Sequence, residues 1–460
     1  MAQTHGTLNK PRYSFSKVDR ALILLCLASP SKKEIEEVRY LFLSNPAWDE
    51  FQTKIQHNDI APLVYLNIMR AELTTLLPPN VLSGLENRYT EIQAKNTARS
   101  IVSNELFERF SKAGVPVIAL KGVLFAETIY KDVGYKKMND LDIFIHFKNV
   151  QEIKQIYSEM GLAPLALLEG GDEEENETKS YHLPAYVSQD LKFVVGTHWM
   201  LCSPKLGFKL NQKKLWDDSL PITINGKPAR ALSPKDALHH LVVHFHYYKT
   251  GLKELSDFIN LIRSVPKFPW TEFSDEIANA GTWTPAFRTL SLVHTLFPAL
   301  VPDELLSKCK NKAEHWTARD TRALCNRRDI LLTSRSVYSS EIEKAYLAFS
   351  FENAFFNKLP WFLTFWKRLF FPPQTTLCRI NAKKEGENSL FWLWVMNIWR
   401  TSREVGRSYG IWIFLLLMLK SSWELLQSIL PNHSHDQMAE LRKNFGVDDT
   451  RLRELMNSME

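Results

Sequence analysis

Two aspartates stand one residue apart in the segment GYKKMNDLDIFIHF, residues 134–147. Side chains alternate across a strand, so Asp140 and Asp142 are expected on one face and the apolar residues next to them on the other. Adjacent carboxylates repel each other unless a positive charge lies between them, and carboxylate oxygens are ligands that suit Mg²⁺. The pattern predicts either a magnesium site or a half-exposed strand end at which both acids are solvated.

The acid pair lies within a segment where strand and helix patterns alternate. VPVIAL, residues 115–120, has the length and apolar character of a buried strand, and VLFAETIY after it has helical spacing. A helix is expected after Asn149, which fits the N-cap, and before Gly161. DLKFVVGTHWML, residues 190–201, is a further strand candidate. Residues 115–230 are therefore expected to form a small unit of strands and helices.

Helical patterns flank this unit on both sides. Ser31 and Glu34 fit a capping box, and a long helix is expected to end at Gly114. Ser233 and Asp236 fit the N-cap and third positions of another helix. We therefore predict an α+β fold, a small mixed sheet with helices embedded in a largely α-helical chain. Its parts are an N-terminal helical segment (1–114), the central unit (115–230), a C-terminal helical domain (231–430) and a charged short helix or tail (431–460).

Composition is that of an ordinary globular protein. The 460 residues are 45% hydrophobic and 23% charged, and their number suggests more than one unit. A net charge of +6 is too weak to indicate nucleic acid as a partner. The five cysteines are scattered, which favours a reducing compartment, and the N-terminal residues lack the apolar core of a signal peptide. A cytoplasmic location is expected.

The C-terminal third is rich in aromatic residues. Its longest apolar run, residues 410–419, is too short to span a bilayer, which takes about 20 residues. We expect the aromatic side chains of residues 350–430 to close a helical core. The alternative is a weak contact of this segment with a membrane surface or another protein, because it mixes aromatic and basic residues as interfacial helices do.

The order of the motifs resembles a known enzyme family. VIALKGVLFAETIY, residues 117–130, followed by KKMNDLDIFI, residues 136–145, resembles the DNA polymerase β-like nucleotidyltransferase superfamily, and more narrowly the bacterial family of uncharacterised nucleotidyltransferases. That family's core is a strand, Lys-Gly, a helix, a basic loop and a strand with Asp-hydrophobic-Asp. Three further blocks resemble the family in the same order: IAPLVYLNIM (60–69), YHLPAYVSQDLKFVVGTHWML (181–201) and LSPKDALHHLVVHF (232–245) with LKELSDFINLI (252–262).

The resemblance implies a role for each motif residue. Gly122 would let the backbone approach the nucleotide phosphates, and Lys121 would meet a phosphate as a point charge unless it is an ordinary surface lysine. Asp140 and Asp142 would hold Mg²⁺ against the triphosphate. Lys136 stands where the family usually has Arg, so it would bind phosphate without the bidentate geometry of a guanidinium group.

The implied activity is transfer of a nucleotidyl group from a nucleoside triphosphate to a hydroxyl or phosphate of a small-molecule or peptide acceptor, with Mg²⁺ as cofactor. An acceptor oxygen would attack the α-phosphorus and pyrophosphate would leave. Phosphoryl transfer from the same triphosphate is a related alternative. The competing class is a degenerate protein that binds a nucleotide or a partner without chemistry.

One position departs from the family pattern. The family's third carboxylate precedes the histidine of the third strand by two residues, and Gly196 stands there. The two-ion site is therefore expected to be incomplete. His198 lies on the same strand face as Gly196 and can serve as a ligand or a base, because a neutral imidazole does either. The alternative is a structural histidine packed by Trp199.

Two histidines four residues apart also fit one helical face. His240 and His244 have the spacing of a zinc motif, but the glutamate that follows the first histidine in zinc proteases is absent. Zinc is therefore not expected. His244 and Asp257 match family positions, and the sequence assigns them no role.

Overall fold

The computed structural model describes most of the first two-thirds of the chain. The described residues are 15–164, 181–188, 192–202, 204, 207–248, 251–313 and the single positions 321, 325, 392 and 395, with only the backbone for 245–248. The chain divides into two units, residues 1–202 with 209–335, and residues 203–208 with 336–460. The elements below all belong to the first unit. The predicted boundary at residue 114 lies at the end of α5 and the one at residue 230 lies within β7, both inside this unit, so the division into domains stays a prediction.

Several expectations fall outside the described residues. The apolar run at 410–419 and the predicted tail at 431–460 lie there, as does the aromatic segment 350–430 apart from Trp392 and Val395. Among the described residues, no helix combines the length and the apolar character needed to cross a bilayer.

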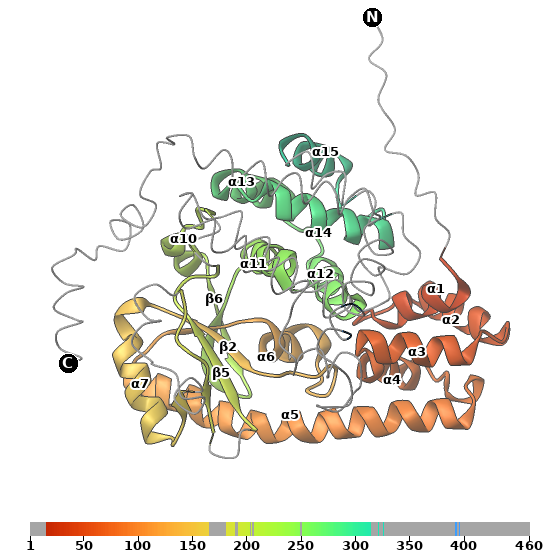
Figure 1. The fold of residues 1–460 in the computed structure, drawn as a ribbon, viewed down its shortest axis with the longest axis horizontal. Coiled ribbons are helices and arrows are strands. Elements are labelled where there is room, and N and C mark those ends of the chain that lie inside the picture. Colours follow the sequence, from red (N-terminus) through yellow and green to blue (C-terminus); the bar gives the residue numbers. More distant parts are fainter. Residues whose placement is uncertain are drawn as a thin grey trace, which may run out of the picture. The chain divides into compact units, whose positions relative to one another are not determined.

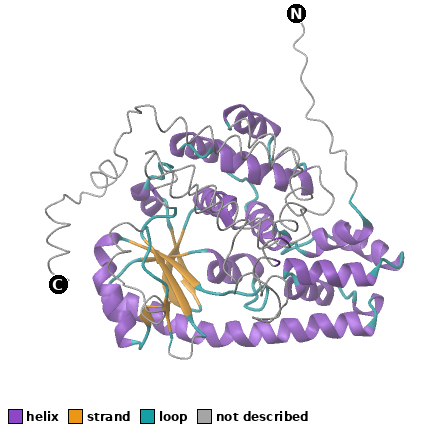
Figure 2. Cartoon of the chain, viewed as in Figure 1, coloured by secondary structure: helices purple, strands orange, loops and turns teal. Residues whose placement is uncertain are grey.

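Helices dominate the described chain on both sides of the sheet (Figure 2). The N-terminal helices are α1 (Lys17–Leu25), α2 (Lys32–Leu43), α3 (Trp48–Asn58), α4 (Ala61–Arg70), the short 3₁₀ turn Thr74–Leu76 and α5 (Pro79–Ala113). Within the sheet region are α6 (Lys121–Phe125), the π-helical turn Ala126–Tyr130, the 3₁₀ turn Phe147–Asn149, α7 (Val150–Glu159) and α10 (Gln212–Asp217). The later helices are α11 (Pro234–Tyr248), α12 (Leu252–Ser264), α13 (Trp270–Ala280), α14 (Trp283–Leu296) and α15 (Asp303–Lys312).

The strands form one mixed seven-stranded sheet in the order β3-β4-β5-β2-β1-β7-β6. They are β1 (Val117–Ala119), β2 (Leu141–Ile145), β3 (Ala163–Pro164), β4 (Tyr186–Val187), β5 (Val194–His198), β6 (Leu220–Ile224) and β7 (Lys227–Ala231). Strand β2 lies at the centre, antiparallel to β1 and parallel to β5. The predicted α+β class is confirmed.

Local sequence signals explain where several elements begin and end. Ser31 and Glu34 form the predicted capping box at the start of α2, and Gly114 ends α5 in the left-handed conformation. Asn149 precedes α7 as predicted, although its side chain makes no capping hydrogen bond. The β6–β7 hairpin, which the sequence analysis did not predict, turns at Asn225 and Gly226, both with positive φ, as a two-residue hairpin turn requires.

The long helix α5 connects the N-terminal helices to the sheet. It contains 35 residues, so it extends over about 52 Å, and it packs against α4, α7 and β7 (Figure 1). Glu108 on α5 and Lys227 on β7 form an ion pair of 2.8 Å. Helix α5 therefore links the N-terminal helix α4 to strand β7 of the sheet.

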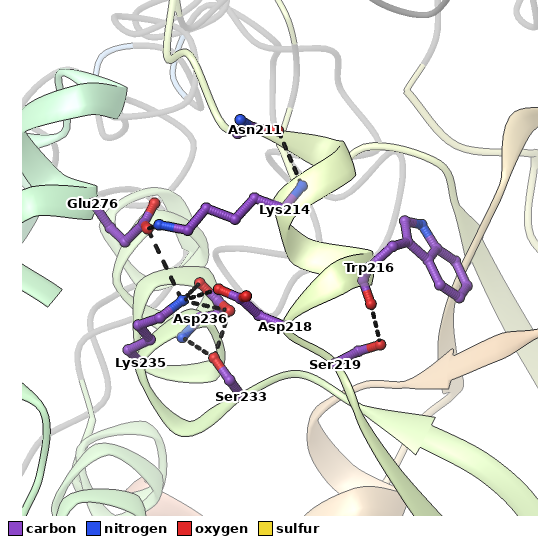
Figure 3. Close-up of polar contacts among 9 residues, drawn as sticks. All are labelled: Asn211, Lys214, Trp216, Asp218, Ser219, Ser233, Lys235, Asp236 and Glu276. Carbon is purple, nitrogen blue, oxygen red and sulfur yellow. Dashed lines mark hydrogen bonds and ion pairs between the residues drawn. The ribbon is translucent and has the colours of Figure 1, made fainter. Parts of the chain in front are cut away.

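A network of charged side chains fixes the start of α11 (Figure 3). Ser233 caps the helix, and its hydroxyl lies 2.5 Å from Asp236 Oδ2. Lys235 Nζ lies 2.7 Å from Asp218 Oδ2 and 3.0 Å from Asp236 Oδ2, and it also approaches Glu276 on α13. Glu276 in turn pairs with Lys214 on α10. The first turn of α11 is thus tied to α10 and α13.

Candidate active site

The two predicted acids lie at the beginning of the central strand. Asp142 is the second residue of β2, and Asp140 immediately precedes the strand. The Asp142 side chain is 12% exposed, whereas Asp140 is exposed. Two carboxylates therefore lie at the start of the central strand. Their hard oxygen donors suit Mg²⁺.

Both oxygens of Asp142 have protein partners. Lys121 Nζ lies 3.1 Å from Oδ2, and His198 Nε2 lies 3.2 Å from Oδ1. Lys121 opens α6 directly after β1, and His198 ends β5, so the two flanking strands deliver one partner each. The structure brings three of the predicted site residues into one cluster.

The surroundings push the pKa values of the two acids in opposite directions. Burial alone would raise the pKa of Asp142, but Lys121, His198 and His244 hold it well below its ordinary value. For Asp140, partial loss of water and then the negative charge of Asp142 raise the pKa, although the residue is exposed. Repulsion between the two acids is thus only partly offset by protein cations, and a bound cation would favour the ionised form of both.

Gly196 lies directly beside Asp142 on the neighbouring strand. In the parallel β2–β5 pair Asp142 is the partner of Gly196, and Phe144 is the partner of His198. A Cβ atom at position 196 would lie 2.8 Å from Asp142 Oδ1 and 3.4 Å from His198 Nε2. Gly196 and His198 thus lie beside Asp142, and position 196 contributes no carboxylate there.

His198 is held by Asp142 and not by Trp199. The Trp199 ring packs against Phe147, with ring centroids 5.2 Å apart, while the His198 ring lies near those of Tyr181 and His182. These contacts place His198 beside Asp142, and its role as a ligand or a base stays a prediction.

Gly122 is the site of a close approach within the protein. A Cβ atom there would lie 3.1 Å from Met138 Cγ, so the glycine lets the loop before β2 pass close to α6. The Tyr135 hydroxyl donates to the Gly122 carbonyl at 3.2 Å. Lys121, which precedes it, has a φ of 43°, the left-handed region that non-glycine residues seldom adopt. The proposed approach of a phosphate to Gly122 stays a prediction.

Lys136 pairs with a carboxylate far along the chain. Its ammonium group contacts Asp257 on α12, and the other oxygen of Asp257 accepts a hydrogen bond of 2.8 Å from the Tyr130 hydroxyl. The rings of Tyr130 and Tyr135 stack, with centroids 3.9 Å apart. Asp257 therefore fastens the loop before β2 to α12. A contact of Lys136 with phosphate stays a prediction.

Helix α11 adds histidines whose role the sequence did not reveal. His240 is 5% exposed, and its ring centroid lies 5.9 Å from that of His244. His244 lowers the pKa of Asp142, and Asp142 acts on the pKa of His240, so both rings belong to the neighbourhood of the acid pair. Apart from the match of His244 to a family position, the spacing of four residues was the signal in the sequence, and it does not distinguish a site from a core face.

Binding of a metal ion by the acid pair stays a prediction. No group of three or more His, Cys, Asp or Glu side chains in this part of the chain is arranged to hold a metal ion. Asp140 and Asp142 would thus provide two ligands, and water or ligand oxygens would provide the others, as is common for Mg²⁺.

The comparison with known proteins agrees with this geometry. A family model described as "Uncharacterised nucleotidyltransferase" matches residues 44–298, which include the whole sheet and helices α3 to α14. No curated protein and no solved structure matches the chain.

Proposed function

Since this chain belongs to the family of uncharacterised nucleotidyltransferases, we propose that it transfers a nucleotidyl group from a nucleoside triphosphate to a hydroxyl or phosphate group of an acceptor, with Mg²⁺ as cofactor. The observation that carries the proposal is the pair Asp140 and Asp142 beside Lys121 at the start of the central strand. A net charge of +6 does not favour nucleic acid, so we propose a small molecule or a peptide as acceptor.

The reaction assigns a task to each residue of the cluster. An acceptor oxygen bonds to the α-phosphorus, the bond between that phosphorus and the bridging oxygen breaks, and pyrophosphate leaves with the bonding electrons. Mg²⁺, when bound, supplies positive charge to the triphosphate. Asp140 and Asp142 would hold it, and Lys121 adds a fixed ammonium charge next to them. His198 is available to take the acceptor's proton or to act as a further ligand.

A reducing, cytoplasmic location is part of the proposal. Cys26, Cys202 and Cys309 are buried free thiols. Free buried thiols are typical of proteins that remain in a reducing compartment.

A second candidate function is nucleotide binding without chemistry. Gly196 favours it, because the family's third carboxylate is missing at the position that faces Asp142. In the transferase, His198 has to compensate for that missing acid. In the binding protein, the remaining acids only hold the metal–nucleotide complex.

The test compares thermal unfolding with and without Mg²⁺ and each of the four nucleoside triphosphates. A nucleotide at about 100 times its dissociation constant stabilises the folded protein by roughly 2.7 kcal/mol, so the rise in Tm is measurable. The double variant Asp140→Asn, Asp142→Asn should lose this rise. The control removes the same number of charges from the exposed positions Asp217 and Asp275 and should keep it. Equal stabilisation of the wild type and the acid-pair variant would remove the metal-site interpretation.

Chemistry is then tested with nucleoside triphosphates labelled at the α-phosphorus. They are incubated with the wild-type protein and an extract of small molecules and peptides from the cells that express it. A labelled product that requires Asp140 and Asp142 supports the transferase. Mg²⁺-dependent binding without any transfer of label supports the binding protein.

A further inference from the structure

A buried histidine near the acid pair makes no ring hydrogen bond to the residues that the structure describes. His240 is 5% exposed, and neither Nδ1 nor Nε2 has a partner in the described part of the chain. The preceding residue shows the ordinary arrangement, since His239 Nε2 lies 2.7 Å from the Thr282 hydroxyl. Buried polar side chains in folded proteins almost always have a partner, so an imidazole with two unpaired nitrogens requires an explanation.

His240 belongs to the cluster of groups around Asp142. Its ring centroid is 5.9 Å from that of His244 on the next turn of α11. Burial first, and then the charges of Lys121 and His244, lower the pKa of His240 well below its ordinary value, while Asp142 acts in the opposite direction. The ring is therefore neutral at physiological pH and close to the proposed reaction centre.

A neutral imidazole selects its ligand by hydrogen bonding. One ring nitrogen donates and the other accepts. An ionised phosphate offers acceptors only, so it can pair only with the ring nitrogen that carries the proton. A hydroxyl group both donates and accepts and can pair with either nitrogen. The ligand chemistry that fits His240 is therefore an uncharged hydroxyl.

We infer that His240 binds a hydroxyl group of the substrate. The inference rests on the proposed function, which supplies two sources of a hydroxyl, the ribose of the nucleotide and an alcohol of the acceptor. The ring is held ready for this contact, because the network of Lys235, Asp236 and Glu276 fixes the first turn of α11 (Figure 3). A rigid helix positions a binding group more precisely than a loop does.

The first measurement is the stability of the protein without ligand. His240→Leu should raise Tm, because it removes a buried polar group that has no partner. His239→Leu is the matched control on the same helix. It should lower Tm, because Thr282 loses its partner, and it should leave the response to Mg²⁺ and nucleotide unchanged. His240→Gln keeps a donor and an acceptor and should retain part of the ligand response.

The second measurement identifies the source of the hydroxyl. If the ribose is bound, the wild type should bind a Mg²⁺–nucleoside triphosphate about tenfold more tightly than its 2′,3′-dideoxy analogue, a difference of about 1.4 kcal/mol. His240→Leu should bind both equally. If the acceptor is bound, His240→Leu should bind the nucleotide normally, and pyrophosphate release with glycerol as the test alcohol should fall about tenfold, as expected for loss of a hydrogen bond worth about 1.4 kcal/mol.

Two outcomes would overturn the inference. One is a lower Tm of His240→Leu, which would mean that His240 stabilises the fold. The other is a higher Tm of His240→Leu with no change in the preference for the nucleotide over its dideoxy analogue and none in pyrophosphate release. That result would mean that bound water or nothing pairs with the ring. Failure of the proposed function is a separate result, because there the wild type itself shows no stabilisation by any Mg²⁺–nucleotide complex.

Discussion

Lys121 Nζ lies 3.1 Å from Asp142 Oδ2, so an ammonium group of the protein occupies the oxygen that the proposed metal would share. Both side chains are largely buried, at 18% and 12% exposed. Lys121 and the proposed metal ion would therefore compete for the same carboxylate, and the lysine stabilises the charged acid without any metal.

Replacing Lys121 tests this competition. Lys121→Met should lower the free energy of unfolding by about 3 kcal/mol, because a buried carboxylate loses one of its two partners. Mg²⁺ alone should then raise Tm more in the variant than in the wild type, since the ion replaces the lost charge. Lys112→Met, at a side chain 75% exposed, is the control and should change neither quantity. An identical response to Mg²⁺ in Lys121→Met and wild type would contradict the competition.

Gly196 is predicted to be intolerant of any side chain. In Gly196→Ala the new Cβ would lie 2.8 Å from Asp142 Oδ1, so the carboxylate has to move away from His198. We expect a loss of about 1–3 kcal/mol in urea unfolding and weaker stabilisation by Mg²⁺ and nucleotide. Gly84→Ala is the control, since its Cβ would meet nothing within 4 Å, and it should stabilise α5 by up to about 1 kcal/mol. Full nucleotide binding by Gly196→Ala would show that the close approach has no functional role.

A double-mutant cycle measures whether His198 replaces the missing acid. Gly196→Asp alone should be destabilising, because its side chain meets Asp142 and His198. His198→Ala removes the imidazole and makes room for that carboxylate, so the double variant should be more stable than the sum of the single changes by at least about 1 kcal/mol. Its Mg²⁺-dependent stabilisation should also exceed that of His198→Ala, because a third carboxylate adds a ligand. Additive effects in both measurements would argue against the replacement.

Lys136 is expected to stabilise the fold through Asp257, so its replacement should lower the free energy of unfolding. Lys136→Met leaves Asp257, at 6% exposed, without its cation, and should cost about 3 kcal/mol in urea unfolding. Lys136→Arg restores the charge and should recover most of the loss. A Lys136→Met protein of wild-type stability that binds nucleotide poorly would instead identify Lys136 as the phosphate contact.

The protein should become less stable as the pH is lowered, because His239 takes up a proton. Burial lowers the pKa of His239 to about 4 in the folded protein, against about 6.5 in the unfolded chain. Between these values the unfolded state binds the proton more tightly, so lowering the pH from about 6.5 to about 4 should reduce stability by roughly 3 kcal/mol from this group. His239→Gln keeps a partner for Thr282 without titrating, and its urea unfolding should depend less on pH over this range. Equal pH dependence in both proteins would contradict the assigned pKa.

Short-range patterns in the sequence predicted much of the site. The alternation of side chains placed Asp140 and Asp142 at a strand, and the same period placed Gly196 and His198 on the face that the structure brings beside them. Capping residues marked the starts of α2 and α11. These features depend on residues a few positions apart, so local geometry is sufficient to predict them. The β6–β7 hairpin was equally predictable, because its Asn225-Gly226 turn is a local signal in the sequence.

Tertiary structure alone decided which charges meet. Lys136 and Asp257 are 121 positions apart, and Lys121 reaches Asp142 only because β1 and β2 are neighbours in the sheet. His239 and His240 are adjacent histidines of one helix, and nothing in the sequence separates their environments. Packing pairs His239 with Thr282, whereas His240, near the acids, has no hydrogen-bond partner within the described part of the chain. The spacing of residues determines on which face of a helix or strand a side chain lies. The partner of that side chain depends on where segments far away in the sequence are placed by the fold.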